Sequence, residues 1–144
     1  MRSMFTGLAV LCAAALLSGS ACGADIPNFN KRGSTDKEEK AFVTEVAQTI
    51  VKEARSSAKD ITLQEYKFKD PKEGHKELTI SAGYVGAAIK TKYSADIVVH
   101  IDVSNKDKWE VLRIEYKDNN KSPVSFSRKD VEALVKKFNS AARE

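Results

Sequence analysis

The two histidines of the chain, His75 and His100, are the first side chains to test for metal or general-base chemistry. His75 falls in the polar stretch 70–75, which is typical of a loop, whereas His100 falls in a stretch of alternating apolar residues that predicts a strand. They form neither a His-x-His nor a His-Glu-x-x-His pattern. We therefore predict no metal site, and we expect His100 to be an ordinary strand residue near Asp102.

Nucleophilic and phosphate-binding chemistry also lacks its sequence patterns. The serines have no nucleophile elbow around them, and Gly83 and Gly86 are not followed by the Lys-Ser/Thr pair of a phosphate loop. Both cysteines, Cys12 and Cys22, lie in the N-terminal segment, so the rest of the chain has no thiol nucleophile or thiolate ligand. We predict a non-enzymatic protein with no catalytic residues and no cofactor.

The N-terminus has the pattern of a secretory signal. Arg2 gives a basic start, residues 8–17 form a short apolar run, and residues 18–21 are small. The apolar run is too short to span a membrane stably. We therefore assign residues 1–21 to a signal peptide and expect an exported bacterial protein, periplasmic or attached to the envelope.

Cys22 follows the small residues directly and resembles the lipidated cysteine of bacterial lipoproteins, which closes a short lipobox. The match is partial, because Gly19 stands where that motif usually has Leu, and Leu17 lies two residues further back. Lipidation of Cys22 and ordinary cleavage after Ala21 or Ala24 therefore both stay open. We expect contact with the membrane only through such an anchor.

Composition indicates a single domain and argues against nucleic acid as its main partner. The chain has 144 residues, 42% of them hydrophobic and 31% charged, with 24 basic and 20 acidic side chains. The positive charges are interspersed with negative ones, which argues against nucleic acid as a partner. The remaining expectation is an unknown envelope protein or a second copy of the chain.

Polar and turn-forming residues over 22–35 predict a flexible tether, and residues 36–144 then form one α+β domain. Thr35 and Glu38 have the spacing of a capping box, and the apolar residues that follow predict a helix over 36–57. A second helix should begin at Ser127, with Asp130 three residues on.

Between the helices, two-residue periodicity predicts four strands. These strands cover residues 61–68, 77–85, 89–103 and 108–117. Consecutive strands flanked by helices favour an antiparallel four-stranded meander with both helices packed on one face, in the order α-β-β-β-β-α. Small secreted domains of the cystatin-like and NTF2-like kind are similar in outline, but the Gln-x-Val-x-Gly motif of inhibitory cystatins is absent, so this likeness implies a shape and no activity.

The last two strands predict both a register and a binding surface. A turn tip at residues 105–106 would pair Val99 with Leu112 and Ile97 with Ile114, which aligns the apolar sides of both strands. The other side would carry a mixed set that includes an aromatic ring and a guanidinium, the groups that anchor interfaces. This expected binding surface consists of Val98, His100, Asp102, Trp109, Val111 and Arg113.

From these observations we expect a non-enzymatic exported domain that binds another protein or its own copy through the open face of the sheet. The alternative is a binder of a small apolar ligand, with a pocket between the first helix and the sheet. That pocket would be lined by Phe42, Ile80, Tyr84 and Tyr93.

Overall fold

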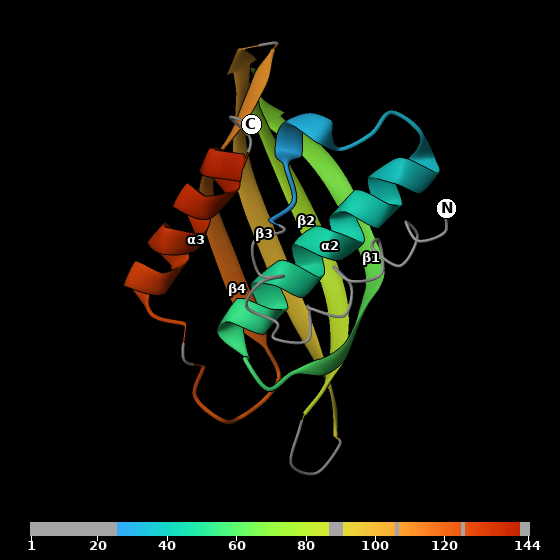
Figure 1. Cartoon of the computed structure of the whole chain (residues 1–144), viewed down its shortest axis with the longest axis vertical. Helices are drawn as coiled ribbons and strands as arrows, with labels where there is room; N and C mark the ends of the chain where they lie inside the picture. Colours follow the sequence, from blue (N-terminus) through green and yellow to red (C-terminus); the bar gives the residue numbers. More distant parts are fainter. Residues whose placement is uncertain (1–25, 87–90, 106, 125, 142–144) are drawn as a thin grey trace, which may run out of the picture.

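In a computed structural model, the chain forms a four-stranded antiparallel sheet in the order β1-β2-β3-β4, with two helices on one face (Figure 1). The structure describes residues 26–86, 91–105, 107–124 and 126–141. The predicted α+β class and the order α-β-β-β-β-α are confirmed. The elements are η3 (Phe29–Lys31), α2 (Asp36–Ala54), β1 (Lys59–Lys72), β2 (His75–Val85), β3 (Lys92–Asn105), β4 (Lys108–Asp118) and α3 (Arg128–Ala141).

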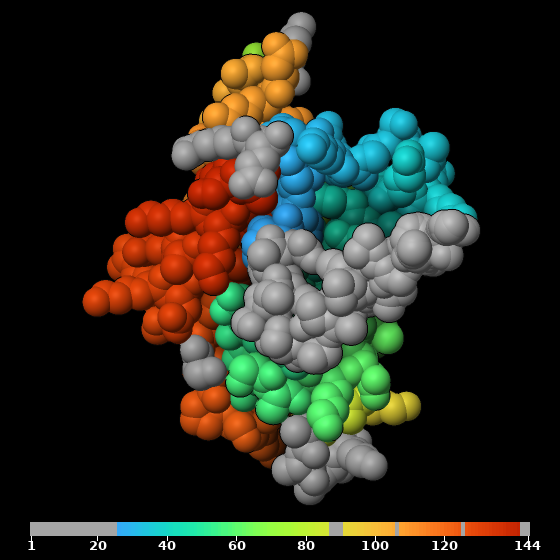
Figure 2. Space-filling model, in the orientation of Figure 1, coloured from blue at the N-terminus to red at the C-terminus, as the bar shows by residue number. Residues whose placement is uncertain are grey.

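Both helices begin where the sequence predicts. The Thr35 hydroxyl accepts a hydrogen bond from the Glu38 amide, and the Glu38 carboxylate accepts one from the Thr35 amide, which completes the capping box. Ser127 and Asp130 make the same exchange ahead of α3. The space-filling view, in the same orientation, shows α3 at the surface on this side of the molecule and parts of α2 beside it (Figure 2). None of the helices among the described residues is both long enough and apolar enough to cross a membrane.

The predicted register of β3 and β4 is wrong by two residues. Val99 pairs with Ile114 and Ile97 with Tyr116, instead of with Leu112 and Ile114. A β-bulge lies opposite the step from His100 to Ile101, and beyond it Ile101 pairs with Val111. Because a bulge inserts one extra residue, it reverses the facing of every β4 residue on one side of it.

Residues 26–32 belong to the packed domain, contrary to the flexible tether predicted over 22–35. Phe29 is 1% exposed and makes edge-to-face contacts with Phe42 of α2 and Phe138 of α3. The segment has the composition of a linker because turn-forming residues surround Phe29. The burial of this one aromatic ring is enough to hold the segment against the helices. The other predicted tether residues at its start, 22–25, lie outside the described residues.

The free edge of β4 is protected by side-chain amides. Asn139 of α3 both accepts a hydrogen bond from the Val111 amide and donates one to the Val111 carbonyl, at 2.8 and 2.9 Å. The Asn30 carbonyl oxygen accepts a hydrogen bond from the Trp109 amide at 2.8 Å. These bonds occupy positions that an added strand would need, so this part of the edge is blocked against pairing with another chain.

A buried ionic network joins the end of α2 to the end of β4. Arg55 donates two hydrogen bonds to the Asp118 carboxylate, at 2.9 and 3.1 Å, and the Asp118 side chain is only 3% exposed. The hydroxyls of Tyr84 and Tyr116 donate to the same carboxylate at 2.9 and 2.6 Å. The guanidinium also donates to carbonyls of the loop after β4, including that of Ser122 at 2.7 Å.

This network predicts a loss of stability in acid. Burial alone would raise the pKa of Asp118, but the hydrogen bonds from Arg55, Tyr116 and Tyr84 outweigh it, so the pKa lies below its ordinary value. A carboxyl with a lowered folded-state pKa stabilises the fold above its unfolded pKa of about 3.9, and that contribution is lost as the pH falls through the folded-state value. Urea unfolding at a series of acidic pH values should show this loss. Asp118→Asn should unfold more easily at neutral pH and show a flatter profile in acid; an unchanged profile would contradict the assignment.

Candidate functional site

The structure divides the expected binding surface between the two faces of the sheet. Val98, His100, Asp102 and Arg113 follow the strand alternation onto the open face, away from the helices. Val111 is buried in the helix-covered core. Trp109 also packs against that core, and the centre of its ring lies 6.1 Å from the centre of the Phe68 ring. The β-bulge explains the division, because it turns this end of β4 over.

Trp109 is held by the N-terminal segment. The guanidinium carbon of Arg32 lies 3.3 Å from the centre of the indole ring, in a cation–π arrangement. The side-chain oxygen of Asn30 accepts a hydrogen bond from the backbone amide of Trp109. Its position is therefore explained by packing.

The four residues of the expected apolar pocket do not enclose one cavity. Phe42 and Ile80 are buried in the core cluster beneath α2, where Phe29 packs against Phe42. Tyr84 and Tyr93 pair across β2 and β3, with their ring centres 5.4 Å apart. Phe29, which the sequence placed in the tether, therefore takes up space beside Phe42.

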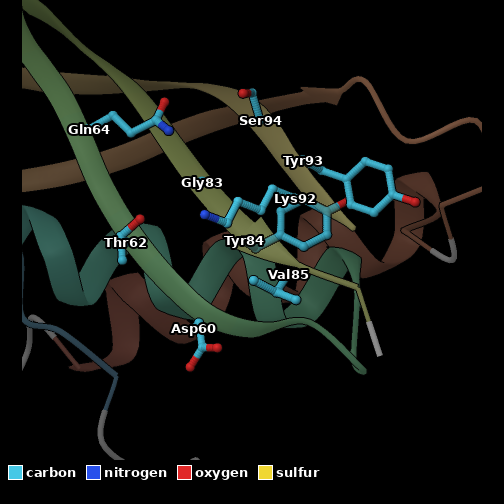
Figure 3. Close-up of a pocket in the computed structure, with 9 residues that line it drawn as sticks. All are labelled: Asp60, Thr62, Gln64, Gly83, Tyr84, Val85, Lys92, Tyr93 and Ser94. Carbon is cyan, nitrogen blue, oxygen red and sulfur yellow. The ribbon is translucent and has the colours of Figure 1, made fainter. Parts of the chain in front are cut away.

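Tyr84 and Tyr93 instead line part of a hollow of about 480 Å³ that extends across β1, β2 and β3 (Figure 3). Gln64 and Thr62 lean over Gly83, since a Cβ on Gly83 would lie 2.8 Å from the Gln64 amide nitrogen. Figure 3 shows the Lys92 side chain running toward Gly83. The hollow offers hydroxyl, amide and ammonium groups. It is lined by Asp60, Thr62, Gln64, Gly83, Tyr84, Val85, Lys92, Tyr93 and Ser94.

Both histidines meet on the open face. The predicted loop over 70–75 is wrong at both ends, because β1 continues to Lys72 and β2 begins at His75. Glu77 pairs directly with His100, and His75 pairs with Asp102, in a β2–β3 ladder without register shifts. The His75 and His100 rings lie 5.7 Å apart. One potential ligand atom from each of His75, Glu77 and His100 lies within 4.8 Å of the others, which is the spacing of a candidate metal centre.

Glu115 and Arg113 surround the other nitrogen of His100. The Glu115 carboxylate lies 2.6 Å from Nε2 of His100, and Arg113 lies 3.1 Å both from that nitrogen and from the carboxylate. An ionised carboxylate only accepts hydrogen bonds and a guanidinium only donates them, so one nitrogen cannot serve both. The shorter contact assigns the Nε2 hydrogen to Glu115. The hydrogen bond from His100, together with the charge of Arg113, lowers the pKa of Glu115.

An apolar groove runs between β4 and α3. The bulge turns Leu112 outward, so that it is 47% exposed and lies beside Val131 and Val135 of α3. The groove has a volume of about 580 Å³. Three basic side chains, Arg113, Arg128 and Lys136, line it together with one acidic side chain, Glu132.

The hollow beside the histidines and this groove share two residues. Leu112 and Arg113 line both, and the hollow, of about 520 Å³, also includes Pro71, Lys72 and the three potential metal ligands. The sequence prediction named Arg113 and missed Leu112. The outward turn of Leu112 depends on a bulge, for which the sequence pattern gives no clear signal.

Comparison with models of protein families, with curated proteins and with solved structures finds no match for this chain. The function therefore has to be argued from this geometry. The expected lipidation site, Cys22, lies outside the described residues.

Proposed function

We propose that the protein is an exported, non-enzymatic domain that binds another protein of the bacterial envelope through the groove between β4 and α3. The observation that carries this proposal is the outward position of Leu112. Bulges commonly re-aim a side chain at a functional position, and Leu112 is one of two large hydrophobic side chains that are exposed among the described residues.

The charges around the groove indicate the chemistry of the partner. Arg128 is 90% exposed and its ion pair with Glu132, at 3.4 Å, is solvated, so it remains available to a partner. An excess of basic side chains around an apolar floor favours a segment that carries an apolar anchor with acidic neighbours. The N-terminal signal pattern supports export, and Cys22 supports a lipid anchor as a further part of the proposal.

Site-specific photo-cross-linking in a bacterial host tests the groove. A photoreactive residue in place of Leu112 should give one discrete adduct, whereas the same residue in place of Lys40, exposed on α2, should give none. Arg128→Glu should reduce the adduct several-fold, because it reverses one of the basic charges.

The mass of the adduct separates the outcomes of this experiment. An adduct of twice the monomer mass would replace the envelope partner with a second copy of this chain. Equal labelling from positions 112 and 40, or none from either, would contradict the docking groove.

A further inference from the structure

We propose that His75, Glu77 and His100 form a binding site for a first-row divalent transition-metal ion on the open face of the sheet. Two imidazoles and one carboxylate are a donor set that suits zinc, copper, nickel and ferrous iron. The two histidines are the only ones in the chain, and the fold brings them together across β2 and β3. The hollow of this site shares Leu112 and Arg113 with the docking groove, but none of its three ligands lines that groove, so the metal proposal does not depend on docking.

The spacing of the ligand atoms fits a metal ion after small side-chain movements. Ligand atoms around a tetrahedral ion, with bonds of about 2.0–2.2 Å, lie roughly 3.4 Å apart. Nδ1 of His100 lies 3.8 Å from the Glu77 carboxylate, and the potential ligand atoms of the three residues lie within 4.8 Å of one another. Rotations that move an atom by about 1 Å would close these gaps, and Glu77 and His75 are only partly buried. The backbone positions are already fixed by the unbroken β2–β3 ladder.

The state of His100 is the strongest support for the site. Its side chain is only 10% exposed, and among the described residues its hydrogen bonds run to Nε2 alone. In the neutral imidazole with its hydrogen on Nε2, Nδ1 carries a lone pair, and this nitrogen faces Glu77 at 3.8 Å, which is beyond hydrogen-bond distance. A ring nitrogen that lies beside a carboxylate without a hydrogen bond, on a side chain only 10% exposed, is an unusual arrangement for a purely structural histidine. A metal ion would satisfy both groups.

Glu115 then acts as a positioning residue. In many metal sites the ligating imidazole donates its other N–H to a carboxylate, which fixes the tautomer and the orientation of the ring. Glu115 lies 2.6 Å from Nε2, and Arg113 holds Glu115 in place at 3.1 Å. The negative charges of Glu77 and Glu115 offset the positive charge of the nearby Arg113, which would otherwise repel a metal ion. The hollow of about 520 Å³ leaves room for water or another ligand to complete the coordination of the ion.

Titration of the purified protein, prepared without a histidine tag, with Zn²⁺ and Co²⁺ tests the site. We expect one equivalent of Zn²⁺ by calorimetry, and visible absorption of bound Co²⁺ that Zn²⁺ displaces. Loss of a residue that only supports a metal ligand costs about 10–100-fold in affinity. His75→Ala and Glu77→Gln each remove a ligand, so each should weaken Zn²⁺ binding by at least that much. Glu73→Gln, an exposed acid in the preceding turn, is the matched control and should bind as the unchanged protein does.

Further variants keep the test independent of folding. His100→Ala removes a buried side chain and can unfold the protein, so His75→Ala and Glu77→Gln carry the comparison, each checked by circular dichroism.

Nitrogen chemical shifts of His100 in metal-free protein should show hydrogen on Nε2, and Glu115→Gln should weaken Zn²⁺ binding by about 10–100-fold. Failure of the unchanged protein to bind Zn²⁺ or Co²⁺, or equal binding by all variants, would overturn the proposal. In the neutral imidazole, hydrogen on Nδ1 in place of Nε2 would overturn the role of Glu115. None of these results bears on cross-linking at Leu112.

Discussion

Arg55→Met should lower the free energy of unfolding by about 3–5 kcal/mol, the cost of leaving a buried charge without its partner. Methionine keeps much of the volume of the arginine side chain but removes every donor. Among the described residues, the Asp118 carboxylate, 3% exposed, would then keep only neutral donors, which are the hydroxyls of Tyr84 and Tyr116 and the backbone amide of Asn120. The loop carbonyls that accept from Arg55, including those of Ser122 and Pro123, would lose that donor too. Urea unfolding followed by circular dichroism measures the change.

An exposed ion pair provides the matched control. Lys76→Met removes a contact of 2.7 Å to Asp70, whose side chain is 71% exposed, and it should cost less than about 1 kcal/mol. The double variant Arg55→Met with Asp118→Asn should recover part of the loss, because it no longer buries an unpaired carboxylate. If Arg55→Met cost no more than Lys76→Met, the buried network would not be what holds α2 to β4.

The sequence predicts the elements of this fold better than their pairing. Apolar periodicity and the caps at Thr35 and Ser127 locate both helices, because these signals are local. The helix predicted over 36–57 ends earlier, at Ala54, and Arg55 leaves the helix to reach Asp118. Contacts between residues 63 positions apart leave no local pattern, so the ionic network could not be predicted.

The binding surface was predicted only in part because it depends on the register of β3 and β4. Alternation in β4 is consistent with Leu112 on the buried side, as long as the strand is regular. The bulge exchanges Leu112 for Val111, which is buried and held at its backbone by Asn139. Both residues are apolar, so composition could not decide which of them faces solvent.

The histidine cluster was missed for a different reason. Its residues form no motif along the chain, since His75 and His100 are 25 positions apart and belong to different strands. The spacing His75-Lys76-Glu77 places two potential ligands on one side of a strand, and this is the one local signal. This signal depends on a strand that includes His75, whereas the polar composition of residues 70–75 predicts a loop.

Phe29→Ala should lower the free energy of unfolding by about 3–5 kcal/mol, as expected when a phenyl ring is removed from a packed core. Phe29 is 1% exposed and its ring centre lies 4.9 Å from that of Phe42 and 5.4 Å from that of Phe138, so it joins both helices. Trp109, the only tryptophan, reports on this segment through its contact with Arg32. Its emission should shift to the red as the Arg32 contact loosens.

The same substitution bears on the proposed lipid anchor. With residues 26–32 packed, Cys22 lies four steps along the chain from Ile26, a reach of at most about 14 Å. If the segment detached up to Asp36, the reach from Cys22 would grow to roughly 50 Å. Phe29 would therefore keep a lipid-anchored form close to the membrane, where the predicted tether would have held it away.

Val124→Ala is the control, because Val124 is 42% exposed and its truncation should change stability by about 0.5 kcal/mol or less. A loss of less than about 1 kcal/mol in Phe29→Ala, with the emission of Trp109 unchanged, would mean that the segment is a loosely attached tether after all. A large loss of stability with a red-shifted emission would make it part of the folded unit, because the same side chain then supports both the core between the helices and the cover over Trp109.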